Sequence, residues 1–213
     1  MRPLYVTVRR RATAELEERR SRFIANVSPV EDEAAALSFV DEIRREYADA
    51  THNVYAYRVG VKVPTQKSSD AGEPAGTAGM PVLEAIRRSD LTNVVVVVSR
   101  YFGGILLGAG GLARTYSRAA LQGLRAAEPV RMVRHIHLRL ELDYSLYGKI
   151  EHLVASRSLR VLDKSFARAV SLVLAVPAPE EDGVRRELAR LSGGTVSMAV
   201  VGSSFLPVAR LKL

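Results

Sequence analysis

The chain contains no cysteine, and it also lacks any long apolar run. Without cysteine there are no disulfide bonds, no thiolate zinc sites and no cysteine nucleophile, as is common in a reducing compartment. No stretch approaches the ~18 apolar residues of a membrane-spanning helix. Residues 1–20 lack the apolar segment of a secretory signal. We therefore expect a cytoplasmic protein with no membrane partner.

Several motifs of known chemistry are missing as well. The chain has no G-K-[ST] phosphate loop, which excludes a P-loop nucleotidase. It has no Ser/His/Asp order that supports a hydrolytic triad, and no third ligand accompanies His135 and His137 for zinc. The sequence therefore predicts neither a metal site nor a cofactor, and it favours a protein that is not an enzyme.

What is present is an ordinary globular composition with a basic excess. The chain has 213 residues, 47% of them apolar and 25% charged, and a net charge of +8. These values predict a packed core. The positive charge favours anionic partners such as nucleic acid or acidic protein surfaces, although arginine greatly outnumbers lysine and this bias can reflect genome composition.

The first half of the chain predicts alternating strands and helices. Ser28 and Glu31 have capping-box spacing and predict a helix that begins there and ends near Tyr47, with Leu37 on its apolar side. Residues 62–79 are rich in Gly, Pro, Ser and Thr and predict a long loop. The other predicted elements are strands at 5–10, 21–30, 53–61 and 94–98, and helices at 81–88 and about 107–127.

The second half predicts a βαββαβ order. Glu128-Pro129 ends the preceding helix, because proline cannot continue it. The strand, helix, strand pair, helix and strand that follow have the pattern of a ferredoxin-like split unit. We predict an α+β protein of two domains, 1–130 and 131–213.

A glycine-rich turn after the valine strand resembles a phosphate-binding loop. Residues 108–113 satisfy G-x-G-x-x-G/A, but residues 99–106 separate the strand from the turn and Glu128 precedes the next strand. Both features argue against a dinucleotide site. The glycines either permit close packing or leave free amides, with Gly103, Gly104, Gly110 and Gly111 as the candidates.

Arginines around this turn suggest an anion site. Arg114, Arg118 and Arg125 lie on one face of the predicted helix, and Arg100 and Tyr101 precede the glycine pair. Arginines and free amides can converge on a phosphate, and an aromatic ring can stack on a base. The alternative for Arg114 and Arg118 is the solvated face of an amphipathic helix.

Three more residues are candidates for chemistry. Asp70 and Glu73 lie in one flexible segment and could serve as acid/base groups or Mg²⁺ ligands, or Asp70 could simply cap turn amides. His52 could be a base, or its ring could be satisfied by backbone groups. We expect segments 68–81 and 99–111 to share one cleft or surface.

Four segments together resemble the IMPACT family, with its YigZ-type bacterial members. They are "RRSRFIANV", "THNVYAYRVG", "SSDAGEPAGTAGMPVLEAI" and "VVVVVSRYFGGILLGAGGLARTYSRA". The resemblance implies a first domain like domain 2 of ribosomal protein S5 and a second domain similar to one of elongation factor G. Eukaryotic relatives regulate translation under starvation through a partner protein.

The sequence departs from the family pattern at two positions. The family loop commonly has a second aspartate where Ala71 stands and a lysine where Met80 stands. Both departures count against a two-aspartate metal centre and a lysine-assisted phosphate site. We therefore expect a regulator of translation that binds RNA or the ribosome. The alternatives are an enzyme acting on a phosphate-bearing or peptide-like substrate, and a module that binds a translation-associated protein.

Overall fold

The computed structural model describes residues 5–210, which form a mixed α+β protein. They divide into two compact units, residues 5–131 and 132–206. Among the described residues, none of the helices has the length and apolarity needed to cross a membrane.

The first unit contains a five-stranded antiparallel sheet in the order β2-β3-β6-β4-β5. Its strands are β2 (Ala12–Glu18), β3 (Ser21–Pro29), β4 (His52–Val59), β5 (Thr65–Ser69) and β6 (Val94–Tyr101). The valine strand β6 is central, and both of its neighbours pair along it: Val96 opposes Val27 on one side and Ala56 on the other. A strand buried on both faces explains the unbroken valine run.

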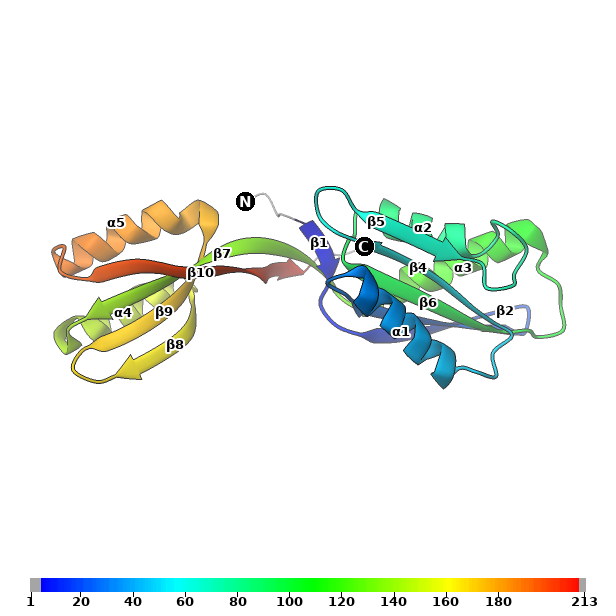
Figure 1. The fold of residues 1–213 in the computed structure, drawn as a ribbon, viewed down its shortest axis with the longest axis horizontal. Coiled ribbons are helices and arrows are strands. Elements are labelled where there is room, and N and C mark those ends of the chain that lie inside the picture. The colour runs from blue at the N-terminus through cyan, green and yellow to red at the C-terminus, as the bar shows by residue number, and fades with distance from the viewer. Residues whose placement is uncertain (1–4, 211–213) are drawn as a thin grey trace. The chain divides into compact units, whose positions relative to one another are not determined.

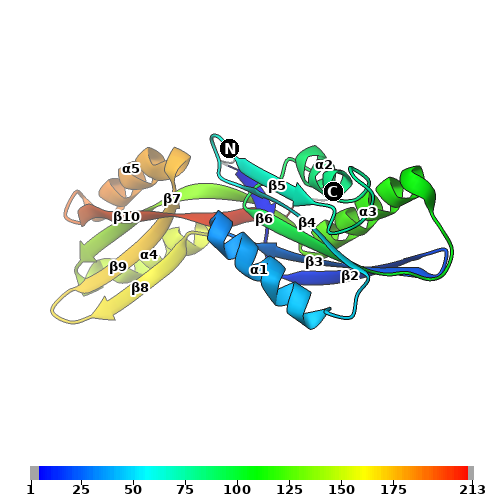
Figure 2. The ribbon, with the colours of Figure 1, turned by 45° about the vertical axis from the view of Figure 1, so that its right-hand side comes forward.

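Helices cover both faces of this sheet (Figures 1 and 2). The even-numbered valines of β6 pack with α2 (Gly79–Arg88) and α3 (Gly108–Ala126). The odd-numbered valines pack with α1 (Glu33–Glu46) on the opposite face. Because side chains alternate along a strand, one apolar segment supplies two cores.

Three predictions for this unit were wrong, and one strand was missed. Ser28 lies in β3 rather than at a helix start, and α1 is capped by Asp32, whose carboxylate accepts from the amide of Ala35 at 2.7 Å. Leu37 is exposed instead of facing the core. The predicted loop 62–79 contains β5, because main-chain pairing with β4 overrides its polar composition. Strand β2 was not predicted.

The second unit has the predicted βαββαβ order. Its elements are β7 (Pro129–Leu142), α4 (Tyr144–Ser156), β8 (Arg160–Phe166), β9 (Val170–Pro177), α5 (Glu181–Ser192) and β10 (Ser197–Arg210), with a short 3₁₀ turn at Ala178–Glu180. Strand β7 pairs with β9 and β10 and also with β1 (Tyr5–Val8), and β8 is an edge strand. The leucines of β7 and β9 form the core with α4 and α5.

Candidate functional site

Segments 68–81 and 99–111 meet, as predicted, at a cavity of about 400 Å³ in the first unit. Glu73 from the first segment and Arg100 from the end of β6 both line it. His52, the first residue of β4, lines the same cavity because its strand lies beside β6 in the sheet. Three polar residues far apart in sequence are thus brought to one place by strand pairing.

Glu73 and Arg100 form a buried ion pair. The Nη1 atom of Arg100 donates to Oε1 of Glu73 at 2.6 Å, and the two side chains are only 6% and 3% exposed, respectively. Short distance and exclusion of water make this a strong charge-assisted hydrogen bond. The pair joins the end of β6 to the loop before α2.

The remaining contacts of Arg100 are also internal. Its Nη2 atom lies 3.5 Å from Oγ of Ser21, and its guanidinium carbon lies 5.4 Å from the ring centre of Phe23 and 5.5 Å from that of Phe102. Its Nε atom is buried without a hydrogen-bond partner. The prediction of Arg100 as a free cation for an external phosphate is therefore corrected, because Glu73 already balances its charge.

Tyr116 is a third member of this network. Its hydroxyl donates to the same Oε1 atom of Glu73 at 2.7 Å from the buried side of α3. Burial, and then the hydrogen bond to Glu73, raise the pKa of Tyr116 far above its ordinary value. Tyr116 therefore stays protonated and donates to the carboxylate.

His52 is oriented by a backbone carbonyl. Its Nδ1 atom lies 2.9 Å from the carbonyl oxygen of Ala71, and its Nε2 atom lies 3.9 Å from Oε2 of Glu73. The first contact agrees with the alternative that backbone groups satisfy the ring. The contact between Nε2 and Oε2 of Glu73 is too long for a hydrogen bond. Nε2 therefore faces the carboxylate without bonding to it.

Asp70 has a structural role at the start of α2. Its carboxylate accepts from the backbone amides of Gly76, Ala78 and Gly79 at 2.8–3.0 Å. Burial acts to raise the pKa of Asp70, but these three amides outweigh it and the pKa is lowered. The turn-capping alternative is the one that the structure supports, and the carboxylate is not poised for acid/base chemistry.

Gly103 serves the fold. A Cβ atom at this position would lie 2.0 Å from the backbone of Arg20, so only glycine fits without moving the β2–β3 turn. The amide of Gly103 already donates to Oγ of Ser21 at 3.2 Å. Gly104 has a φ of +82° in open space, which glycine adopts without strain. Both glycines therefore serve the turn after β6, and the amide of Gly103 is not free to bind a ligand.

Gly110 and Gly111 lie in the first turn of α3. The residue at the helix start, Leu107, makes no side-chain hydrogen bond to the first-turn amides. Gly108 and Ala109, one step earlier, line the cavity beside Glu73. The positive end of the helix macrodipole thus faces this cavity.

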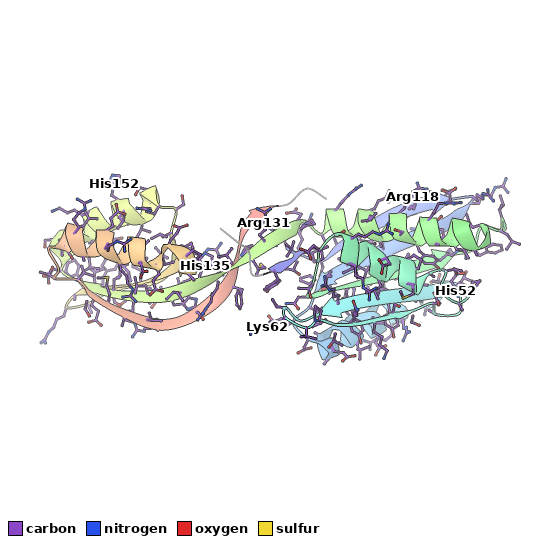
Figure 3. The ribbon with its side chains drawn as sticks, turned by 90° about the horizontal axis from the view of Figure 1, so that it is seen from above. His52, Lys62, Arg118, Arg131, His135 and His152 are labelled. Atoms are coloured by element: carbon purple, nitrogen blue, oxygen red, sulfur yellow. The ribbon has the colours of Figure 1, made fainter. Side chains whose placement is uncertain are left out.

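Arg114 and Arg118 lie elsewhere, in a groove between α2 and α3. This α2–α3 groove has a volume of about 640 Å³, and its lining includes Arg88, Arg114 and Arg118, one carboxylate, Glu84, and five uncharged residues. Gly111, Arg114 and Arg118 together line a smaller cavity, with Arg19 and Glu18, and Arg118 donates to Glu18 there at 2.9 Å. Figure 3 labels Arg118 on α3 and His52 on β4. The predicted single anion pocket is therefore divided between a cavity and a groove.

Tyr101 lines neither the cavity beside Glu73 nor the α2–α3 groove. Its hydroxyl donates to Asp49 at 2.7 Å, and the guanidinium of Arg22 lies 5.9 Å from its ring centre.

Within residues 5–210, no three His, Asp or Glu side chains are arranged to hold a metal ion.

Three residues of these sites were not predicted from the sequence. The first is Tyr116, for which a signal was available, because a buried tyrosine hydroxyl normally needs a hydrogen-bond partner. Ser21 could not be found, because its partners Arg100 and Gly103 are distant in sequence. Arg88 ends α2 and faces the groove only through the packing of α2 on α3.

Family profiles match most of the chain. The Impact N-terminal domain matches residues 19–124, and a domain of unknown function, DUF1949, matches residues 140–195. These matches fit the two compact units.

Known proteins are similar over nearly the whole length. The IMPACT family member YvyE of Bacillus subtilis is 35% identical over 192 residues, which cover 89% of this chain and 88% of that protein. YigZ of Escherichia coli is 33% identical and covers 87% and 92%, respectively. Protein IMPACT of Xenopus laevis is 39% identical over 98 residues, which cover 44% of this chain and 31% of that protein.

A solved structure described as a hypothetical protein is also similar. It has a TM-score of 0.58 and 30% sequence identity, and the alignment covers 93% of this chain and 97% of that chain. The likeness extends across both units.

Proposed function

Because the chain belongs to the IMPACT family, we propose that it regulates translation in the cytoplasm by binding structured RNA through the α2–α3 groove. At the level of the family, membership supports the translation-related role that the resemblance implied. The single observation behind RNA binding is the gathering of Arg88, Arg114 and Arg118 along one groove. Guanidinium groups pair with phosphates in a bidentate geometry, which suits a nucleic-acid backbone.

The charges of the groove are available to a partner. Arg88, Arg114 and Arg118 are exposed, and the pair between Arg118 and Glu18 is itself exposed, with side chains 56% and 33% accessible. Exposed pairs contribute little free energy, so a phosphate can replace Glu18 at small cost. The net charge of +8 also attracts polyanions such as RNA at long range, which favours binding at the groove.

We also propose the finer fold assignments for the two parts of the chain. Residues 1–130 are a domain like domain 2 of ribosomal protein S5, and residues 131–213 are a ferredoxin-like domain. Support for the second comes from the βαββαβ order and from β7, which lies between β9 and β10 in the sheet.

Replacing both Arg114 and Arg118 by alanine should weaken binding to structured RNA about tenfold at low salt, since two phosphate contacts are lost. The slope of the logarithm of the binding constant against the logarithm of salt concentration should fall by about one per arginine. Filter binding or fluorescence anisotropy across a salt series measures both quantities.

The matched control is Arg125→Ala, which removes an exposed arginine of α3 that does not line the groove. It should leave RNA binding within about twofold of the unmodified protein. Absence of RNA binding at low salt, or an equal loss in the control, would refute the groove as the RNA-binding surface.

A further inference from the structure

The cavity beside Glu73 contains two acceptor atoms that face each other. Arg100 and Tyr116 both donate to Oε1 of Glu73, which leaves Oε2 without a hydrogen bond although the side chain is 97% buried. Nε2 of His52 lies 3.9 Å from Oε2. Because the Ala71 carbonyl can only accept, the tautomer with its proton on Nδ1 is the one that fits this contact, and Nε2 is then an acceptor.

Two acceptors at this separation match a ligand with neighbouring hydroxyl groups. Each hydroxyl of a vicinal diol can donate to one of the two atoms. A charged amine is a poorer match, because the Arg100 guanidinium and the positive end of α3 border the same cavity. The donor that fits is therefore neutral.

The first turn of α3 forms another wall of the cavity, and its free amides can bind a negatively charged group. Gly108 and Ala109 line the cavity, and Leu107 before them supplies no side-chain acceptor for the first-turn amides. This helix is 19 residues long, so its macrodipole is well developed. Uncapped amides at such a terminus suit a phosphate.

The third feature of the cavity is an apolar rim. Phe102 and Leu106 line the cavity and are 46% and 79% exposed, respectively. An exposed aromatic ring and a leucine can cover the face of a base. The volume of about 400 Å³ lies in the range of small-ligand sites and accommodates one nucleotide.

We propose that this cavity binds a single ribonucleotide with a 5′-phosphate and free ribose hydroxyls, either a nucleoside 5′-monophosphate or the 3′-terminal nucleotide of an RNA. The ribose hydroxyls donate to Glu73 and His52, the phosphate accepts from the first turn of α3, and the base packs on Phe102. The site is separate from the α2–α3 groove and does not depend on it.

Calorimetric titration of the full chain with AMP tests the proposal. AMP should bind, and adenosine, 2′,3′-dideoxy-AMP and inorganic phosphate should each bind at least tenfold more weakly, since each lacks at least one set of contacts. A short RNA with a 3′-hydroxyl compared with the same RNA carrying a 3′-phosphate distinguishes the two sources. In the Arg114→Ala/Arg118→Ala variant, which weakens RNA binding by the groove, tighter binding of the 3′-hydroxyl RNA than of both the 3′-phosphate RNA and AMP assigns the site to RNA ends. Tighter binding of AMP than of the 3′-hydroxyl RNA assigns it to free nucleotides.

The decisive variants are Ala109→Glu and its neutral counterpart Ala109→Gln. Ala109 is exposed in the first helical turn, where a carboxylate suits the macrodipole and the fold is retained. Ala109→Glu should weaken AMP binding at least tenfold and Ala109→Gln less than about threefold. Thermal unfolding of both variants checks the fold.

Either of two results would overturn the proposal: no binding of AMP at millimolar concentration together with equal binding of the 3′-hydroxyl and 3′-phosphate RNAs, or equal effects of Ala109→Glu and Ala109→Gln. The Arg114→Ala/Arg118→Ala variant should bind AMP normally. The failure of this site and the failure of the groove are therefore measured separately.

Discussion

Replacing Glu73 by glutamine should lower the free energy of unfolding by about 3–5 kcal/mol, the range for removing one partner of a buried ion pair. Glutamine keeps the shape of the side chain but not its charge. Arg100 would then be a buried cation that faces a neutral amide oxygen in place of a carboxylate, and its contact with Oγ of Ser21 is long, at 3.5 Å. The hydroxyl of Tyr116 would also face a weaker acceptor. Urea unfolding followed by circular dichroism measures the change.

Glu84→Gln is the matched control. Glu84 also pairs with an arginine at 2.6 Å, Arg87, but both side chains are well exposed, at 41% and 37%. Its loss should cost less than about 1 kcal/mol, because water screens exposed pairs. A Glu73→Gln variant no less stable than this control would show that the buried pair is not needed for the fold.

A double variant separates charge from packing. Glu73→Leu together with Arg100→Met removes both charges and retains most of the side-chain volume. It should be more stable than Glu73→Gln, because apolar replacements of a whole buried pair are often neutral or stabilising. If the double variant is instead less stable than Glu73→Gln, burial of an unpaired charge is not the main cost.

Replacing Asp70 by alanine should lower the free energy of unfolding by about 2–3 kcal/mol at pH 7, as expected for hydrogen bonds to a charged acceptor at a helix start. Three amides lose their common acceptor, and those of Ala78 and Gly79 belong to buried residues. The start of α2 and the loop that carries Glu73 should loosen together. Amide hydrogen exchange of α2, with urea unfolding, measures the effect.

The effect of Asp70→Ala should depend on pH. The folded-state pKa of Asp70 lies below its unfolded value, so its stabilisation is complete above the unfolded pKa and is lost as pH falls through the folded pKa. The stability difference between the two proteins should therefore narrow below about pH 4. Asp163→Ala, at an exposed position on β8, should show no comparable loss at pH 7. A difference that stays constant from pH 7 to pH 3 would contradict the assigned role.

Much of the fold was predictable because it depends on local patterns. The valine run predicted a strand, and the structure confirms it as β6, the central strand. The break at Glu128-Pro129 correctly ended α3, and Glu128 has a φ of +59°, outside the helical region. The start of α1 was predicted at the wrong residue, because Ser28 and Asp32 both have side chains that can cap a helix. Strand pairing of β3 with β6 decides between them, since it extends through Pro29.

The candidate site was only partly predictable for the same reason. The unusual segments 68–81 and 99–111 were recognised from composition, and their meeting is confirmed. The assignment of partners was not possible, because Arg100 and Tyr116 reach Glu73 across 27 and 43 positions of sequence, respectively. No spacing rule within one helix or strand links such residues.

By itself, the sequence determined most of the element types, the family and the set of polar residues near the glycine turn. Periodicity, proline and glycine positions and motif residues are all properties of neighbouring positions. Only the tertiary structure decided that Arg100 is neutralised by Glu73 and that Arg114 and Arg118 face a separate groove. The physical reason is that a charge acts according to what surrounds it after folding. Strand pairing and helix packing, rather than the order of residues, determine which charges are buried together and which remain in water.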